Sequence, residues 1–351
     1  MRPAEPRFLR RIKELRPVAR YAFFLGSWEV GLGYMTARAA DFHPFFSNRR
    51  VVFLLATLCC LLWGSSYPAI KNGFAMFALQ PDDMAGKLVF AGWRCLLAGV
   101  LLLGIAVLSN KDIVALKPKN WAEIASLGLL QTSIMFVFFY VGLAYTTGVK
   151  SSVLNGTVSF FGVLLAHFIY RNDRLTWAKS LGCLIGFGGV LAVNVNRGLL
   201  DFSFTLIGEG SMILSAFFMA AGMIYGKRVS QHMDSSLMTG YQLAFGGAVL
   251  LAVGYVLGGE LAHVTLKSSL ILGYLVLNSS VAYTLWSVLL KYNRVGMVSV
   301  FNFLVPIFGA MLSAIFLGET LLEWKNLLAL LLVCGGIWLV TLEKQGNHRL
   351  P

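Results

Sequence analysis

The chain has 351 residues, of which 57% are hydrophobic and 13% are charged, and its mean hydropathy is +0.72. An ordinary soluble domain has about 25% charged residues, so this composition excludes a soluble globular protein and requires a surface that faces lipid. The formal net charge of +13 is typical of nucleic-acid binding in a soluble chain, but in a membrane protein its meaning depends on where the basic residues lie.

From residue 51 onward the chain is a series of apolar segments, each near the length of about 20 residues that a helix needs to cross a bilayer. We therefore expect an all-α polytopic membrane protein with ten membrane-spanning helices, short loops and no separate soluble domain after residue 50. The predicted spans are 51–70, 86–108, 121–143, 148–169, 177–195, 205–226, 237–258, 269–290, 297–317 and 326–342.

Basic residues are distributed unevenly between the two sides that this map defines. The side that holds both termini has 22 Lys and Arg residues, the opposite side has six, and Arg94 lies within a span. Because short cytoplasmic loops are enriched in Lys and Arg, we expect both termini to be cytoplasmic, in a bacterial inner membrane. The net charge is then a signal of topology, and we expect no nucleic-acid partner.

Residues 1–50 differ from the rest of the chain. Basic side chains from Arg7 to Arg16 alternate with Phe8, Ile12 and Leu15 at helical spacing, which is typical of an amphipathic helix on an anionic membrane surface. We expect a basic cytoplasmic extension, and the alternatives are an interfacial helix or a gene-model artefact in which translation starts at Met35. Residues 343–351 are expected to form a cytoplasmic tail.

The two halves of the chain, 51–195 and 205–342, resemble each other. A shift of 147 residues aligns rare residue types that seldom coincide by chance, and a shift of 148 does so in the second span of each half. Each half has five spans, so the second half would enter the membrane from the opposite side, and inverted repeats suit alternating access. The aligned positions include Gln131 with Asn278, Asn155 with Asn302, Trp177 with Trp324, and, at the longer shift, Arg94 with Gln242.

Three segments resemble a known family. Segment 63–71 (WGSSYPAIK) is similar to the opening of EamA-type members of the drug/metabolite transporter superfamily, 93–99 (WRCLLAG) to that family's second span, and 302–319 to its Pro-Val-Phe to Leu-Gly-Glu signature. The first half departs from the pattern, because it has Ser159 where the second half has Pro306. The resemblance covers residues 51–342. It implies a ten-helix fold with a cavity lined mainly by spans 1, 3, 4, 6, 8 and 9, and transport of small organic metabolites, often outward.

Polar amides inside spans are the first candidates for substrate contact, because polar groups at this depth avoid lipid. They are Gln131, Asn155, Asn278 and Asn302, all on spans that line the cavity under the resemblance. An amide both donates and accepts hydrogen bonds, which suits a zwitterionic or polar neutral solute. The alternative is an interhelical hydrogen bond, worth about 0.6 kcal/mol.

Aromatic residues are the second candidates, as an apolar wall or a cation–π surface. The alternative for each is ordinary helix packing. With Ser66, the substrate-binding set also contains Trp63, Tyr67, Tyr140, Tyr283 and Trp286. Gly64, Pro68 and Pro306 are candidates for a hinge or a broken helix, because proline removes a helix hydrogen bond; the alternative is a harmless kink.

Few charges lie near the membrane interior. Arg94 is either an anchor for a substrate carboxylate, a moving ion-pair partner, or a fixed arginine that snorkels or bonds to backbone carbonyls. Glu209 and Glu319, at the outer ends of spans 6 and 9, are candidates for proton coupling. The five cysteines lie in apolar runs without CxxC spacing, so we expect no metal site and no cofactor.

These features favour a secondary transporter or facilitator that moves a small polar organic solute, such as an amino acid or a related metabolite. The alternatives are a channel, a non-transporting membrane sensor or a membrane-embedded lipid enzyme. An enzyme would need an intramembrane cluster of His, Asp or Glu, and the sequence has none, so we expect no enzymatic activity.

Overall fold

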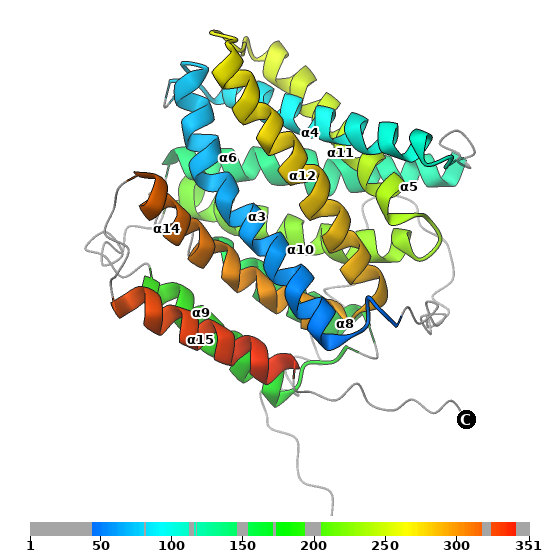
Figure 1. The fold of residues 1–351 in the computed structure, drawn as a ribbon, viewed down its shortest axis with the longest axis vertical. Coiled ribbons are helices and arrows are strands. Elements are labelled where there is room, and N and C mark those ends of the chain that lie inside the picture. The colour runs from blue at the N-terminus through cyan, green and yellow to red at the C-terminus, as the bar shows by residue number, and fades with distance from the viewer. Residues whose placement is uncertain are drawn as a thin grey trace, which may run out of the picture.

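The computed structural model of the chain consists of helices and connecting turns, without a strand in the residues it describes (Figure 1). The prediction of an all-helical chain is confirmed for these residues. Most of the expected N-terminal extension and the whole C-terminal tail lie outside them. The described residues are 44–80, 82–111, 116, 118–145, 154–170, 173–193, 205–317 and 324–341.

The described helices form ten continuous rods, and each rod overlaps one of the ten predicted spans. Three rods are compound, since α5, η1 and α6 follow one another, as do η3 and α10, and α13, η4 and α14. The elements are α3 (Arg49–Met76), α4 (Met84–Leu108), α5 (Pro118–Gly128), η1 (Leu129–Ile134), α6 (Met135–Tyr145), α8 (Thr157–Ile169), α9 (Trp177–Val193), η3 (Leu206–Gly210), α10 (Ser211–Ser230), α11 (Ser235–Val256), α12 (Leu266–Tyr292), α13 (Val295–Ser299), η4 (Val300–Phe303), α14 (Leu304–Leu317) and α15 (Trp324–Thr341).

Six of the described rods are long and apolar enough to cross a membrane. They are Arg49–Met76, Met84–Leu108, Pro118–Gly142, Leu206–Ser230, Ser235–Val256 and Leu266–Tyr292. Large apolar side chains are exposed on the outside of the rods, for example Leu54 on α3 and Leu184 on α9. An apolar outer surface of this extent is unfavourable in water, so the chain is an integral membrane protein.

Short polar side chains define where several helices begin. Asp83 accepts a hydrogen bond from Gly86 N at the start of α4, at 2.7 Å, and Asp234 does the same for α11. A reciprocal pair formed by Thr265 and Ser268 starts α12. Side-chain acceptors satisfy backbone N–H groups that the first helical turn leaves free, so these residues fix the boundaries between apolar runs.

Two prolines lie inside helices and have different local effects. α3 is continuous through the buried Pro68, so the structure has no break there, and a hinge role for Pro68 stays a prediction. Pro306 is the third residue of α14 and lies three residues after the end of the 3₁₀ segment η4, which contains Asn302. Because Pro306 has no N–H to donate to the carbonyl of Asn302, the backbone tightens before the α-helix resumes.

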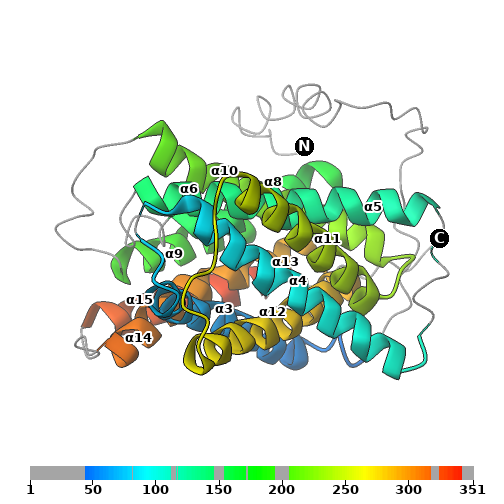
Figure 2. The same ribbon diagram turned by 90° about the horizontal axis from the view of Figure 1, so that it is seen from above.

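Six rods form two layers, and the other four close the ends (Figures 1 and 2). α3 packs against α12 and α14 in one layer, and α10 packs against α6 and α8 in the other. α4 packs against α11 at one end of the molecule, and α9 packs against α15 at the opposite end. Each layer contains helices from both halves of the chain, so residues of both halves bound the region between the layers, which we term the interlayer region.

Candidate functional site

Aromatic side chains meet in the interlayer region. The ring centroid of Trp63 on α3 lies 4.9 Å from that of Trp286 and 5.6 Å from that of Tyr283, both on α12. Trp63 also packs in one hydrophobic cluster with Tyr140 of the opposite layer. Among the described residues, the buried indole nitrogens of Trp63 and Trp286 have no hydrogen-bond partner. Buried indole N–H groups usually find a partner, so this wall offers two donors.

Arg94 enters the same region from α4 and bridges the layers. Its side chain is buried, and its Nε donates to Ser279 Oγ on α12 at 2.7 Å. The guanidinium carbon lies 6.0 Å from the ring centroid of Phe136 on α6, in the opposite layer. The arginine therefore does not snorkel to the membrane surface.

Tyr67 and Tyr140 extend the aromatic wall. Tyr67 OH on α3 accepts a hydrogen bond from Asn155 Nδ2 at 3.2 Å, and the rings of Tyr67 and Phe139 lie 6.4 Å apart. Tyr140 is 1% exposed, and its hydroxyl has no partner among the described residues. Asn155 thus joins the layers through Tyr67, while the Tyr140 hydroxyl adds a third unsatisfied polar group to the interlayer region.

The buried Asn278 makes a dense set of contacts between α3 and α12. Its Nδ2 donates to Leu62 O at 2.6 Å and to Ser65 Oγ at 3.2 Å, while its Oδ1 accepts from Ser66 Oγ at 3.3 Å. Both ends of the amide are therefore engaged by α3. Ser66 likewise uses its hydroxyl within this contact, so the two predicted site residues hold the helices of one layer together in this structure.

Gln131 and Asn302 lie at two further positions. Gln131 Oε1, in the π-helical segment η1, accepts from Gln242 Nε2 on α11 at 2.9 Å. Asn302 Nδ2 donates to Ser299 O in its own rod at 3.1 Å. The four predicted amides thus take part in separate contacts instead of one cluster. Their part in binding a solute stays a prediction.

Comparisons with known proteins place this architecture in a family. A model of the EamA-like transporter family matches residues 50–195 and, a second time, residues 206–342. The chain belongs to this family. This confirms the resemblance seen in segments 63–71, 93–99 and 302–319, and it is consistent with the drug/metabolite transporter superfamily.

Relatives of this EamA-like chain are named as transporters. It is 26% identical over 296 residues to an uncharacterized transporter of Archaeoglobus fulgidus, covering 83% of this chain and 97% of that one. It is 28% identical to the uncharacterized transporter YvbV of Bacillus subtilis (85% and 93% covered) and 27% identical to the uncharacterized inner membrane transporter YedA of Escherichia coli (81% and 88%). These names and the family indicate a membrane transporter rather than an enzyme.

A solved crystal structure has the same fold as this EamA-like transporter. Its TM-score is 0.68 at 17% sequence identity, and the match covers 84% of this chain and 98% of that chain. The likeness concerns the fold alone, because the sequences differ at most positions.

One of the two acidic candidates for proton coupling, Glu209, lies at the start of the rod formed by η3 and α10. Glu209 is buried in η3, where its Oε2 accepts from the backbone N and the hydroxyl of Thr205 at 2.8 and 2.7 Å. Glu319 lies outside the described residues. The contacts of Glu209 are those of a helix start, and a role in proton coupling stays a prediction for both residues.

Sequence reasoning missed a buried ion pair in the first half of this EamA-like chain, whose aspartate also accepts a hydrogen bond from the second half. Asp173 Oδ1 accepts from Lys179 Nζ at 2.7 Å, and Asp173 Oδ2 accepts from Gly296 N at 2.7 Å; both charged side chains are 2% exposed. Burial and the nearby Asp173 carboxylate raise the pKa of the Tyr170 hydroxyl, which donates to Ile224 O. No spacing signal finds the contact between the halves, because Asp173 and Gly296 are 123 residues apart.

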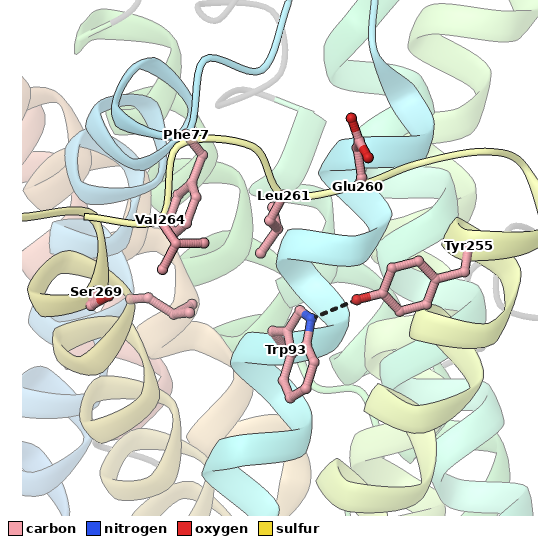
Figure 3. A pocket seen from close by; sticks show the side chains of 8 residues that line it. Phe77, Trp93, Tyr255, Glu260, Leu261, Val264 and Ser269 are labelled. Atoms are coloured by element: carbon pink, nitrogen blue, oxygen red, sulfur yellow. Dashed lines mark hydrogen bonds between the residues drawn. The ribbon is translucent and has the colours of Figure 1, made fainter. Parts of the chain in front are cut away.

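A surface pocket of about 400 Å³ lies elsewhere, between the ends of α3, α11 and α12 and the side of α4 that carries Trp93 (Figure 3). In it, Trp93 Nε1 donates to Tyr255 OH at 3.0 Å, and Glu260 adds a carboxylate. None of the predicted substrate-binding residues of this EamA-like transporter lines the pocket. The pocket residues are Phe77, Trp93, Tyr255, Glu260, Leu261, Val264, Ser269 and Leu272.

Proposed function

We propose that the protein is a secondary transporter or facilitator that carries a small polar organic solute, such as an amino acid, a related metabolite or a drug, outward across a bacterial inner membrane. In this proposal both termini are cytoplasmic, and residues 51–195 and 205–342 form two inverted five-helix repeats. The solute binds in the interlayer region while the repeats alternate between two arrangements.

The observation that carries this proposal is the symmetry of helix packing. The repeat relates α3 to α10, α4 to α11, α6 to α12, α8 to α14 and α9 to α15. α3 packs against α12 and α14, and its counterpart α10 packs against α6 and α8, which are the counterparts of those two helices. α4 and α9 each pack against their own counterpart. Exchange of the two halves therefore preserves these pairings, as inverted repeats require.

A pair of polar contacts supports the same relation at the level of side chains. Gln242 is the counterpart of Arg94 at the shift of 148, and Gln131 is the counterpart of Asn278, the residue before Ser279, at the shift of 147. Arg94 Nε donates to Ser279, and Gln242 Nε2 donates to Gln131. The repeat relates α4 to α11 and relates α12 to the rod that contains η1. The polar contact between α4 and α12 thus corresponds to the polar contact between α11 and η1.

Symmetry of this kind gives a mechanism for alternating access. Two conformations related by exchange of the halves have similar contacts and therefore similar free energies. A small difference in the affinity of the solute for the two conformations is then enough to shift the equilibrium between them. Because each layer contains helices of both halves, relative movement of the halves changes the interlayer region from both sides. The aromatic residues and Arg94 lie in that region.

Counterflow in liposomes tests transport by this protein. Purified protein is reconstituted with an unlabelled solute mixture inside, and uptake of each labelled solute is followed against protein-free liposomes. A carrier gives saturable uptake that the internal solute accelerates. Electrical current that does not saturate, without counterflow, would instead identify a channel, and no flux of any solute would contradict the proposed function.

The amide hypothesis predicts a loss of transport when Asn155 and Asn302 are both changed to alanine. We expect solute flux to fall about tenfold or more, because two hydrogen bonds to a polar solute at about 1 kcal/mol each are lost together. Initial rates in counterflow measure the effect. Gln80→Ala, at an exposed loop position, is the control, and unchanged flux in the double variant would exclude these two residues from the site.

A further inference from the structure

We infer that the transported solute is an organic anion and that Arg94 binds its carboxylate in the interlayer region. The inference rests on the proposed transport function and specifies the class of its substrate. It depends on where the arginine lies, on the lack of an acidic residue in the described helices packed against α4, on the comparison between the two halves, and on the groups around the guanidinium.

Arg94 is a full charge in the middle of the membrane-spanning part. It lies ten residues after the start of α4, which corresponds to about 15 Å along the helix axis, and it is 3% exposed. Its single hydrogen bond to the described residues runs from Nε to Ser279 Oγ. An arginine stays protonated in proteins, so its terminal nitrogens carry four further N–H donors that these residues do not engage.

The surrounding helices supply no counter-charge. α4 packs against α11, α12 and α6, and none of these four helices contains an aspartate or a glutamate. Glu123 on α5 is engaged by His232 at 2.7 Å. A buried charge without an opposite charge costs several kcal/mol, and the ring of Phe136 at 6.0 Å offsets only part of that cost.

The second half of the chain shows that the fold does not need this charge. The equivalent of Arg94 is Gln242, which joins the corresponding pair of rods through a neutral amide, Gln131. A glutamine therefore suffices to join these helices. The positive charge is specific to the first half, so we assign it to the solute instead of to helix packing.

The groups that bound the interlayer region suit a carboxylate attached to an apolar or aromatic body. Trp63 Nε1, Trp286 Nε1 and Tyr140 OH are buried hydrogen-bonding groups without partners among the described residues, and the two indole groups are donors only. Their rings and that of Tyr283 form an apolar wall. A guanidinium binds a carboxylate through two parallel hydrogen bonds. A zwitterion leaves the net positive charge of the region in place, whereas an anion neutralises it.

A defined mixture of solutes that do not cross bilayers tests the inference. Liposomes containing the full-length protein are loaded with succinate, glutamate and phenylsuccinate as anions, glutamine and phenylalanine as zwitterions, and lysine and choline as cations, in sulfate buffer at zero membrane potential. Mass spectrometry measures release of each solute. We expect the wild-type protein to release at least one anion about tenfold faster than any zwitterion or cation.

Variants at Arg94 test the assignment of the residue. Arg94→Gln, which imitates the second half, should lower anion release about tenfold or more, since a charged hydrogen bond contributes about 1.5–3 kcal/mol. Arg94→Lys keeps the charge but loses the two parallel hydrogen bonds, and we expect it to raise the KM for anions severalfold with kcat nearly unchanged. Lys71→Gln removes an exposed positive charge on α3 and is the matched control. The lysine variant gives a readout even where the glutamine variant does not fold.

The outcomes separate the two proposals. Release of zwitterions or cations without anions overturns the anion assignment and leaves the transport function intact, whereas no release of any solute contradicts both. Unchanged KM for anions in folded Arg94→Gln or Arg94→Lys protein excludes Arg94 as the anchor. Competition by chloride, added in place of sulfate, would identify an inorganic anion as the occupant and overturn the carboxylate assignment.

Discussion

Replacing Gly99 by leucine should separate α4 from α11 and destabilise the protein by about 3 kcal/mol. A Cβ atom at Gly99 would lie 2.3 Å from Ala244 N and 2.5 Å from Gly240 O, both backbone atoms of α11. Backbone atoms cannot rotate away as a side chain does, so the helices have to move apart. Overpacking of a close contact costs about 1–3 kcal/mol, and occasionally more, and contacts through small residues are the main attraction between membrane helices.

Thermal unfolding in detergent, followed by the monodisperse fraction after heating, measures this effect. Gly104→Leu is the matched control, because Gly104 lies on the same helix and a Cβ there would meet nothing within 4 Å. Leucine has a higher helix propensity than glycine by about 0.8 kcal/mol, so the control should be neutral or more stable than the wild type. Equal stability of the two variants would show that α4 and α11 do not pack as described.

The close packing of α4 and α11 also shows what a hydrophobic sequence predicts and what it does not. The ten spans follow from apolar runs of sufficient length, because each helix satisfies its own backbone hydrogen bonds in lipid. Their partners do not follow, since hydropathy is nearly uniform around such helices. Gly92, Gly99 and Gly247 mark the close contact, but glycine is frequent in membrane helices, and its presence alone does not identify which helix approaches.

The predicted polar residues show the same limit. Because polar groups are unfavourable in lipid, the sequence predicted that Gln131 and Asn278 face protein. Both side chains are buried. Which partner each one has depends on helix rotation, and the structure gives Gln131 an amide on α11 and Asn278 a set of groups on α3.

Changing Asp173 to alanine should lower the free energy of unfolding by about 3–5 kcal/mol. The substitution removes the carboxylate that faces the buried ammonium of Lys179 and the backbone N–H of Gly296, at 2.7 Å each. Removing one member of a buried ion pair leaves the other charge in a medium of low polarity, which costs far more than the pair itself contributes. Chemical or thermal unfolding of the purified protein measures the change.

Two further variants distinguish an effect of burial from a general effect of charge. Lys111→Ala breaks the ion pair with Asp234, whose side chains are 37% and 42% exposed, and exposed pairs contribute about 1 kcal/mol or less. Changing Asp173 to alanine and Lys179 to methionine together removes both charges and should restore most of the lost stability. If the double variant is as unstable as Asp173→Ala, the loss of stability comes from the missing hydrogen bond to Gly296 and not from the unpaired charge of Lys179.

The position of Asp173 gives this pair a consequence for transport as well as for stability. It follows α8 in the first half and holds the start of α13 in the second half, so it fixes the two halves to each other at one end of the rods. In the alternating-access proposal such a contact has to open and close in each cycle. Asp173→Asn keeps an oxygen acceptor for Gly296 N while removing the charge, and we expect it to lose less stability than Asp173→Ala but to change the counterflow rate. A rate equal to that of the wild type would mean that this end of the protein does not open during transport.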